Sequence, residues 1–387
     1  MAIDFNLTEE QETYRRMIRE FIKRECPPEL DREIEENERF PEEILPKLAA
    51  TGVFGLCFPE EYGGNGGTAL DFALVVEEMT YGSEAAAACY LLPVFFAGQM
   101  ILLNGSEEQK KTLLPRIIAG KMKGAFALTE PEAGSDASAV STSAVPDGPD
   151  HFLVNGMKHY ISGADVADYI MTVTRTNKDD KYNGLTIFMV DRNSPGLTIR
   201  KQPKLGSRCV SLCELTFDDV RVPRDAIVGG PDALDSGWYH MMASLDMERI
   251  MVAAAHVSLA QKSYEAALAY AKTRRQFGRE IGKFQAIQWQ LVNMLIDIEA
   301  GRNLTYKAAW KACGTERMSK DGSLAKIFCT EMALRVTQSA MQVLGGQSYL
   351  MDSDVQRWAR MAMLGPIGMG TNNIQRLIVA TNLGLVG

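Results

Sequence analysis

Apolar residues recur every three or four positions through most of the first 120 residues, and this spacing predicts helices that each bury one face. The stripe between residues 9 and 26 follows Thr8, with Gln11 three positions later, so a capping box is expected there. Pro41 is expected to open another helix, because a first turn does not need the amide hydrogen that proline lacks. Further helices are expected at 71–79 and 107–118, and a glycine-rich loop at 59–67.

From about residue 123 the pattern changes to short runs of β-branched and aromatic residues separated by proline and glycine. The run 151–162 has such residues on both sides of Asn155-Gly156, a dipeptide typical of a hairpin turn. Other strands are expected at 169–174, 185–190, 197–200 and 213–217. This region is therefore predicted to be a small antiparallel β domain, either a barrel or a sandwich.

The chain then returns to helical spacing, and its longest expected helix covers 241–278 without a proline. Two more long helices are expected at 284–312 and 320–344, the second ended by Gly345-Gly346, and a last one after Thr371. Long helices with short connections indicate an antiparallel bundle. The order predicts an α+β chain of three domains, with bounds 1–122, 123–235 and 236–387.

Composition narrows the partners and the compartment. The net charge of −8 makes nucleic acid an unexpected partner. Seven scattered cysteines favour a reducing, cytoplasmic compartment, and the C-x3-C pair Cys209 and Cys213, with no histidine nearby, is a weak metal signal. The N-terminus has neither the basic region nor the apolar core of a signal peptide.

The segment 85–103 is nearly all apolar and about as long as a bilayer crossing. It contains Pro93, Gly98 and Gln99, and its flanks are acidic rather than basic. A buried pair of helices is therefore expected there, not a membrane span.

Four loops and helix ends offer chemistry that could bind a ligand. Glycines and hydroxyls gather in the loop 128–136 and in Tyr160-Ile161-Ser162, while 342–346 and 365–373 place glycines beside helix ends that suit an anion. Taken singly, each is equally typical of an ordinary turn or helix cap.

Two charged pairs mark the long helix. Glu248 and Arg249 lie in an apolar run near its start, and Arg274 and Arg275 lie at its end. From the helix alone, a structural ion pair and a solvated basic terminus are the simpler interpretation, because cations favour a helix C-terminus.

Taken together and in order, these segments resemble the acyl-CoA dehydrogenase family of flavoproteins. The resemblance covers almost the whole chain. It is carried by TEEQ (8–11), PEEYGG (59–64), LTEPEAGSD (128–136), KHYIS (158–162), RRQFG (274–278), QVLGG (342–346) and the GTNNIQR segment (370–376).

The resemblance implies a helical N-terminal domain, a β middle domain and a C-terminal four-helix bundle, usually in a homotetramer, with FAD between the last two domains. It assigns to FAD binding Phe126, Leu128, Thr129, Ser135, Tyr160, Ser162, Arg274, Gln285, Gln342, Gly345, Gly346, Thr371 and Asn373. It assigns to substrate binding Ser135, Asp246, Arg249, Gly368 and Gly370. Arg274, Gln285 and the 342–346 loop are expected to serve FAD across a subunit interface.

In this family a glutamate removes the α-proton of an acyl-CoA while a hydride goes to the flavin. Most members carry that base in a Y-E-G-T loop, where this chain has Gly368-Met369-Gly370-Thr371, and methionine cannot accept a proton. Isovaleryl-CoA dehydrogenase carries it instead on the long helix in D-x-E-R, and this chain has Asp-Met-Glu-Arg at 246–249. Glu248 is therefore the expected base.

The Met369 backbone amide and the flavin ribityl 2′-hydroxyl are then expected to hydrogen-bond the thioester oxygen. Apolar surroundings should raise the pKa of Glu248, and Gly368 should leave room for a short, branched or cyclic acyl group.

Three functions are compatible with these motifs. The first is acyl-CoA dehydrogenation with electrons passed to an electron-transfer flavoprotein. The second is an enoyl-CoA reductase of the carnitine-pathway type, which runs the same chemistry backwards, and the third is a non-redox lyase relative. A role in binding alone fits less well, because the positions expected to contact FAD are intact.

Overall fold

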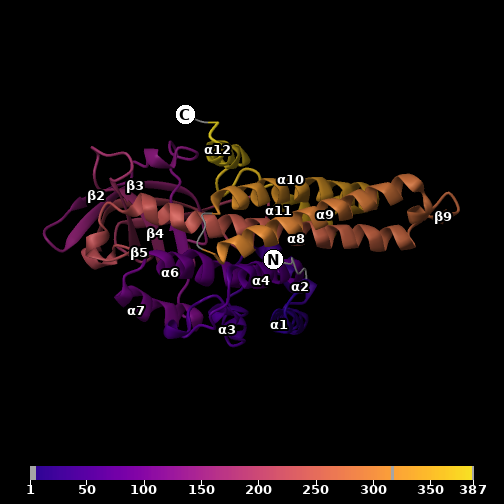
Figure 1. The fold of residues 1–387 in the computed structure, drawn as a ribbon, viewed down its shortest axis with the longest axis horizontal. Coiled ribbons are helices and arrows are strands. Elements are labelled where there is room, and N and C mark those ends of the chain that lie inside the picture. The colour runs from indigo at the N-terminus through magenta and orange to yellow at the C-terminus, as the bar shows by residue number, and fades with distance from the viewer. Residues whose placement is uncertain (1–5, 315–317, 386–387) are drawn as a thin grey trace.

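The computed structural model describes residues 6–314 and 318–385 of the 387-residue chain. Helices from the first third form the lower part of the view in Figure 1, the sheet lies at the left, and the long C-terminal helices extend to the right. The succession of helices, strands and helices confirms the predicted fold class. The predicted domain bounds stay predictions.

The N-terminal helices are α1 (Glu9–Glu25), α2 (Pro28–Asn37), α3 (Leu45–Ala49), α4 (Ala69–Gly82), α5 (Glu84–Tyr90), α6 (Met100–Asn104) and α7 (Glu107–Ile118). The capping box between Thr8 and Gln11 is present as predicted. The helix predicted to open at Pro41 is wrong by four residues, because residues 41–44 form a turn and Pro46 instead occupies the first turn of α3.

The apolar segment 85–103 is one continuous helix rather than the predicted pair. A π-helical segment, η3 (Leu91–Gln99), joins α5 to α6, and its wider turns accommodate Pro93 without a break. In the part of the chain that the structure describes, the helix Glu84–Asn104 alone is long and apolar enough to cross a membrane. However, 72% of its most apolar window is buried inside the protein, as in a core helix.

The strands are β1 (Gly124–Ala127), β2 (Ser143–Pro146), β3 (His151–Ser162), β4 (Tyr169–Arg175), β5 (Leu185–Asp191), β6 (Leu197–Gln202) and β7 (Leu212–Pro223). They join in the order β1-β4-β2-β3-β7-β6, and β5 also pairs with β4. Most pairs are antiparallel as predicted, but β1 lies parallel to β4, so the sheet is mixed. The parallel strand β1 directly follows the helical region in the chain, and its residue Phe126 packs against the hydrophobic core of that region.

The hairpin predicted at Asn155-Gly156 is wrong, because β3 continues through both residues and pairs with β7 on either side. The register shifts between Val154 and Gly156, which marks a β-bulge. Gly156 has a φ of 143°, and a Cβ there would lie 2.7 Å from the Cα of Thr142. The dipeptide therefore serves a bulge in a long strand, where a side chain would not fit.

The C-terminal elements are α8 (Gly237–Thr273), β8 (Arg275–Gln276), β9 (Arg279–Glu280), α9 (Gln285–Ala312), α10 (Ser319–Leu344), α11 (Asp354–Ala362) and α12 (Asn372–Asn382). The expected extension of the long helix to Gly278 is wrong, since β8 and β9 form a hairpin in which Phe277 and Gly278 both have positive φ. The helix α11 was not predicted, whereas α12 begins after Thr371 as expected.

The long helices run up, down and up. Ser319 at the start of α10 donates to Asp246 near the start of α8, so these two helices begin at the same end. Gln290 near the start of α9 donates to the carbonyl of Ser339 near the end of α10, so α9 runs the other way. This agrees with the predicted antiparallel bundle.

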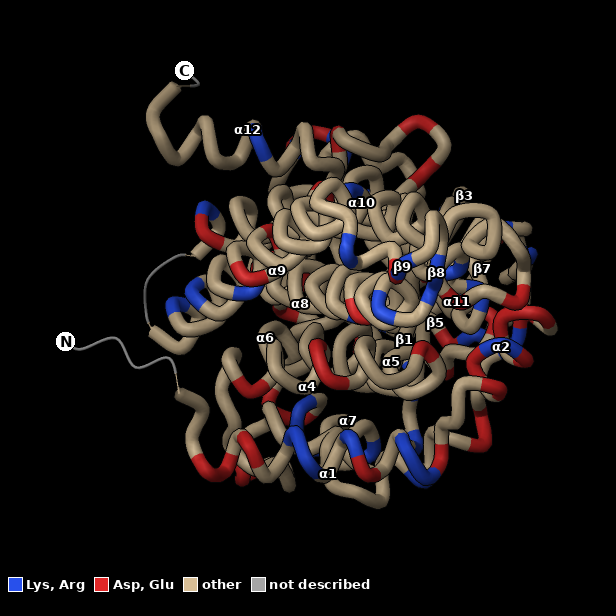
Figure 2. Tube along the Cα trace, turned by 90° about the vertical axis from the view of Figure 1, so that its right-hand side faces the viewer, with Lys and Arg blue, Asp and Glu red and all other residues tan. Residues whose placement is uncertain are grey.

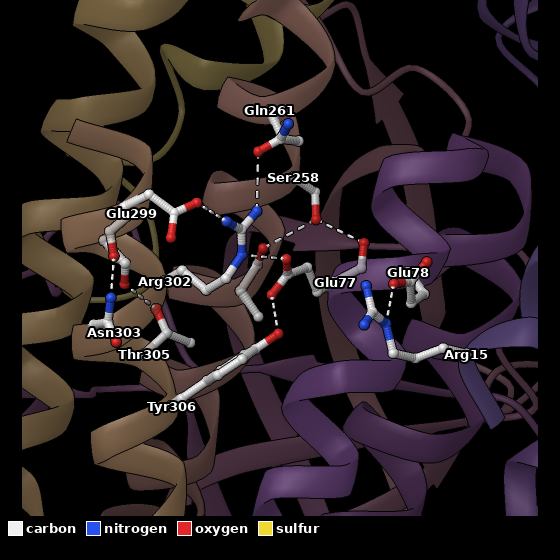
Figure 3. A network of polar contacts seen from close by, with 12 residues as sticks. Arg15, Glu77, Glu78, Ser258, Gln261, Glu299, Arg302, Asn303, Thr305 and Tyr306 are labelled. Atoms are coloured by element: carbon white, nitrogen blue, oxygen red, sulfur yellow. Dashed lines mark hydrogen bonds and ion pairs between the residues drawn. The ribbon is translucent and has the colours of Figure 1, made fainter. Parts of the chain in front are cut away.

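Polar contacts fasten the N-terminal helices to this bundle (Figure 3). The carboxylate of Glu77 on α4 accepts hydrogen bonds from Arg302 at 2.9 Å and from Tyr306 at 2.8 Å, both on α9. The next residue, Glu78, binds Arg15 of α1 at 2.7 Å. Because α4 is tied to α1 on one side and to α9 on the other, the N-terminal helices are held against the C-terminal bundle.

Acidic and basic residues alternate along the N-terminal helices around α1 and α7, at the lower rim of the view in Figure 2. Arg15 pairs with Glu12 in α1, and Lys110 pairs with Glu107 in α7, each three residues apart on one helix. Such alternation is typical of solvated helix faces and carries no site of its own.

Candidate active site

A cavity lies between the apolar helix Glu84–Asn104 and the first turns of α8, with an empty volume of about 340 Å³ that includes its open mouth. Its lining residues are Phe95, Phe96, Gln99, Met100, Phe126, Met241, Ser244, Leu245 and Glu248. The α8 members recur every three or four residues, so one face of this helix forms a wall of the cavity. Asn104 donates to the carbonyl of His240, which shows that the two helices run antiparallel here.

Glu248 is the acidic group in this mostly apolar lining, and only 8% of its surface is exposed. Burial raises its pKa from 4.5 to about 7, against the opposing effect of the cations Arg249 and Lys326. The direction of this shift is the one predicted from the apolar sequence around it. A carboxyl group with a pKa near neutrality is suited to accept a proton at physiological pH.

Asp246 and Arg249 form an ion pair within one turn of α8, and Asp246 also accepts a hydrogen bond from Ser319. A structural ion pair is therefore present, but it joins Arg249 to Asp246 and not to Glu248, the pairing considered from the helix alone. The Nε of Arg249 is buried without a hydrogen-bond partner among the described residues, so part of the guanidinium is unsatisfied. Their assignment to substrate binding stays a prediction.

The loop before α12 carries the expected oxyanion donor in an uncommon conformation. Met369 has a φ of 53° and Gly370 a φ of 68°, so two successive residues are left-handed. The Met369 amide donates to no acceptor in the described part of the chain. A Cβ on Gly368 would lie 3.1 Å from Leu364, so this glycine also permits close packing within the loop.

The sequence analysis missed the group that holds this loop. Lys326 of α10 is fully buried and donates to the carbonyl oxygens of Gly365, Gly368 and Gly370 at 2.8, 3.2 and 3.0 Å. It also donates to Oδ1 of Asn372 at 2.9 Å. The available signal was a lysine within the apolar face of a predicted helix, where a charge needs partners.

A second buried lysine fastens the predicted flavin loop. Lys158 of β3 is fully buried, and its ammonium contacts Glu130 at 2.8 Å and the carbonyl of Leu128 at 3.0 Å. The neighbouring amide of His159 donates to the carbonyl of Thr129. The loop 128–136 and the strand segment 158–162 are thus joined, although sequence reasoning did not single out Lys158 or Glu130.

This junction leaves Tyr160 in a distinctive position. Its φ is 60°, at a register shift of β3, and 62% of its surface is exposed. An exposed aromatic ring held by a left-handed backbone offers a flat apolar face to a ring ligand. Ser135 is exposed on the adjoining loop, and Ser162 is half-buried.

The predicted site residues fall into two separate groups. The group around the cavity and the sheet comprises Phe126, Leu128, Thr129, Ser135, Tyr160, Ser162, Asp246, Glu248, Arg249, Gly368, Met369, Gly370, Thr371 and Asn373. The group at the other end of the bundle comprises Arg274, Gln285, Gln342, Gly345 and Gly346. Figure 1 shows β9, which follows Arg274 in the chain, at the tip of the bundle farthest from the seven-stranded sheet.

The separation is set by α8. From Glu248 to Arg274 the chain advances 26 residues, which is about 39 Å along a helix axis. Arg274 is exposed and makes no ion pair with the other described residues, whereas Arg275 binds Glu280. A guanidinium without a protein partner is suited to a diphosphate.

Comparison with known proteins identifies the family. Models described as the N-terminal, middle and C-terminal domains of acyl-CoA dehydrogenase match residues 8–121, 125–220 and 235–384. The chain is 38% identical over 384 residues to a probable acyl-CoA dehydrogenase, YngJ, of Bacillus subtilis, covering 98% of this chain and 100% of that one. The chain belongs to the acyl-CoA dehydrogenase family.

Other similar proteins extend the comparison. A 3-(aryl)acrylate reductase of Clostridium sporogenes is 37% identical, covering 97% of this chain and 99% of the relative. The solved butyryl-CoA dehydrogenase of Megasphaera elsdenii superposes with a TM-score of 0.93 at 34% identity, covering 98% and 100%. A structure of PigA with FAD and proline has a TM-score of 0.92 at 27% identity and covers both chains completely. The family is FAD-dependent, and this chain is an oxidoreductase of the acyl-CoA dehydrogenase type.

Proposed function

We propose that this protein catalyses the FAD-dependent α,β-dehydrogenation of a short, branched or cyclic acyl-CoA, with Glu248 as the base that removes the α-proton. One observation carries the proposal: a buried carboxyl group with a pKa of about 7 lines a mostly apolar cavity. The base arrangement is that of isovaleryl-CoA dehydrogenase, with Asp-Met-Glu-Arg on the long helix and Met369 in the loop.

Two groups of this chain act on different atoms of the bound thioester. Glu248 accepts the proton from the α-carbon, and the Met369 amide donates a hydrogen bond to the thioester oxygen as negative charge develops there. When bound, FAD supplies the two-electron acceptor for the hydride that leaves the β-carbon. The apolar walls exclude water, which strengthens both electrostatic interactions.

The cavity limits the size of the acyl group. From Glu248 to Met241 the lining of α8 extends over seven residues, about 10 Å along the axis. Phe95 and Phe96 face this wall from the opposite helix, with ring centroids 5.5 Å apart. A compact acyl group fits this space better than a long, fully extended one.

FAD fits the residues on both sides of the proposed site. The exposed ring of Tyr160 and the joined loop 128–136 suit the flavin, and the left-handed loop ends at the helix N-terminus capped by Thr371. Arg274, Gln285 and Gln342–Gly346 lie too far away to reach the same molecule. We therefore assign them to the FAD of a second copy of the chain, which supports a homo-oligomer; the homotetramer is what the family resemblance implies.

The base is tested by Glu248→Gln, which keeps the shape of the side chain and removes its proton affinity. Anaerobic bleaching of the flavin by an acyl-CoA should fall by about 10² to 10⁴-fold, while the purified protein stays yellow. Glu265→Gln, an exposed position about 26 Å further along α8, should leave the rate unchanged. Near-normal bleaching in the first variant would refute the assignment.

The same site also supports the reverse reaction, because oxidation and reduction share one transition state. The similarity to a 3-(aryl)acrylate reductase favours this second candidate. Measurement of the flavin midpoint potential with saturated and unsaturated thioesters decides the direction. A dehydrogenase would pass its electrons to an electron-transfer flavoprotein, and we expect a cytoplasmic location for either direction.

A further inference from the structure

The buried ammonium group of Lys326 contacts the loop that carries the proposed oxyanion donor, the Met369 amide. Three of its four acceptors are carbonyl oxygens of the segment Gly365–Gly370, so this segment turns its oxygens toward one buried ammonium group. The fourth acceptor, Asn372, opens α12 and also hydrogen-bonds Thr330 and Glu331. Lys326 thereby joins the loop, α12 and α10 at one point.

Peptide geometry turns this contact into a constraint on the donor. The carbonyl of Gly368 and the amide of Met369 belong to one planar trans peptide, so they point in opposite directions. Because the Gly368 carbonyl is directed at Lys326, the Met369 N–H is directed away from it. The left-handed conformation of Met369 costs energy, and the buried contacts of Lys326 offset that cost.

Charge gives Lys326 a second connection to the reaction. The groups that act on it from the packed helices are Glu248, Arg249 and His256 of α8 and Glu331 of α10. Burial lowers the pKa of His256 to about 4, so this neighbour is neutral. Lys326 and Arg249 both favour the ionised form of Glu248, against the effect of burial.

We propose that Lys326 is a positioning residue for the dehydrogenation, which orients the Met369 amide toward the thioester oxygen and electrostatically favours the ionised Glu248. This inference rests on the proposed function. It assigns one buried cation to both halves of the reaction, the base and the oxyanion donor.

The test compares Lys326→Met with Lys262→Met. Lys262 is also buried, but it lies on α8, about 21 Å along the helix axis from Glu248, and it donates to the carbonyl of Thr80. Lys326→Met should lower kcat by at least about tenfold with a smaller change in KM, because a donor to the transition state is misplaced. The acid limb of its pH–rate profile should move upward by about one pH unit, since the base loses a nearby cation.

A structural role alone predicts a different result. Lys262→Met should reduce the yield of folded protein without moving the acid limb. If the acid limb of Lys326→Met coincides with that of the wild type, the proposal is overturned. If the wild-type protein itself does not react with any acyl-CoA, the proposed function fails instead, so the two failures are distinguishable.

A measurement of stability, which does not need turnover, keeps the test informative if a variant is inactive. The stability gain of Glu248→Gln over its parent grows with pH until Glu248 is ionised in the folded protein, so the pH at which the gain levels off reports that ionisation. That pH should be higher in the Lys326→Met background. If this variant does not fold, Asn372→Asp places a neutralising charge 2.9 Å from the lysine and should move the acid limb in the same direction. No movement in Asn372→Asp would contradict the inference.

Discussion

At the scale of single residues, the ionised side chain of Glu248 lowers the free energy of unfolding of the protein. Its carboxyl group is buried in an apolar cavity, and burial raises its pKa from 4.5 to about 7. Between these two values the folded protein binds a proton that the unfolded chain has lost. The free energy of unfolding therefore falls as the pH rises through this window.

Removing the charge should reverse that cost. Glu248→Gln is expected to be more stable than the wild type by up to about 3 kcal/mol at pH 8, because 2.5 pKa units correspond to about that much free energy. The difference should vanish about one pH unit below 4.5, where the wild-type carboxyl is protonated in both the folded and the unfolded state. Urea unfolding from about pH 3.5 to 8 measures it, and a stability gain that does not depend on pH would speak against this origin.

At the scale of elements, the buried pair of Lys158 and Glu130 fastens the loop 128–136 to β3. Glu130 also accepts hydrogen bonds from the amides of Ser141 and Thr142. Burial alone would raise the pKa of Glu130, but the ammonium of Lys158 and then these hydrogen bonds lower it to about 2. Burial lowers the pKa of Lys158 to about 8, but the contact with Glu130 opposes that shift. We infer that both groups are charged at neutral pH, since each is hydrogen-bonded to the other.

Breaking this pair from one side should leave an uncompensated charge inside the protein. Lys158→Met is expected to lower the free energy of unfolding by about 3 to 5 kcal/mol, as measured by denaturant titration. The double variant Lys158→Met with Glu130→Gln should recover part of the loss, because no buried charge remains. A double variant as unstable as the sum of both single ones would show that the pair is not coupled.

Elements with a sustained period were predictable from the sequence, and local turn signals were less so. The stripe along α8 and the cap at Thr8 predicted their helices, because one face of each is buried. Asn155-Gly156 predicted a hairpin, but the same dipeptide suits a bulge when the partner strand continues on both sides. Period alone did not reveal that Pro93 lies inside a continuous helix.

The candidate site was predictable where a motif carried its chemistry. Glu248 followed from a resemblance, and the cavity that it lines was visible only in the structure. Lys326 and Lys158 escaped notice because a lysine becomes informative only when its burial and its acceptors are known. The sequence alone does not reveal which loop carbonyls surround an ammonium group.

At the scale of the whole molecule, the proposed function assigns the two groups of predicted FAD residues to more than one chain. Exposed apolar side chains follow one face of α9, namely Trp289, Val292 and Ile296, with exposed fractions of 62%, 54% and 61%. Their spacing of three and four residues makes a continuous stripe. A second copy of the chain is the partner that would also bring Arg274 to the other FAD.

Charges placed on this stripe should separate the copies. Val292→Glu combined with Ile296→Glu is expected to reduce the mass measured by light scattering to that of smaller assemblies. The same variant should lose FAD on gel filtration, because each cofactor then lacks the contacts from the neighbouring chain. Lys111→Glu, an exposed position on α7, should change neither property. A doubly substituted protein of unchanged mass would exclude this face as the interface.

The length of α8 between Glu248 and Arg274 has a consequence for how such chains can diverge. One inserted residue would rotate everything beyond it by about 100° and advance it by about 1.5 Å, so the guanidinium would face a different direction. Seven inserted residues would nearly restore the direction but overshoot by about 10 Å. Substitutions along this rod can therefore accumulate, whereas gaps and insertions within it would uncouple one subunit's proton chemistry from its neighbour's cofactor.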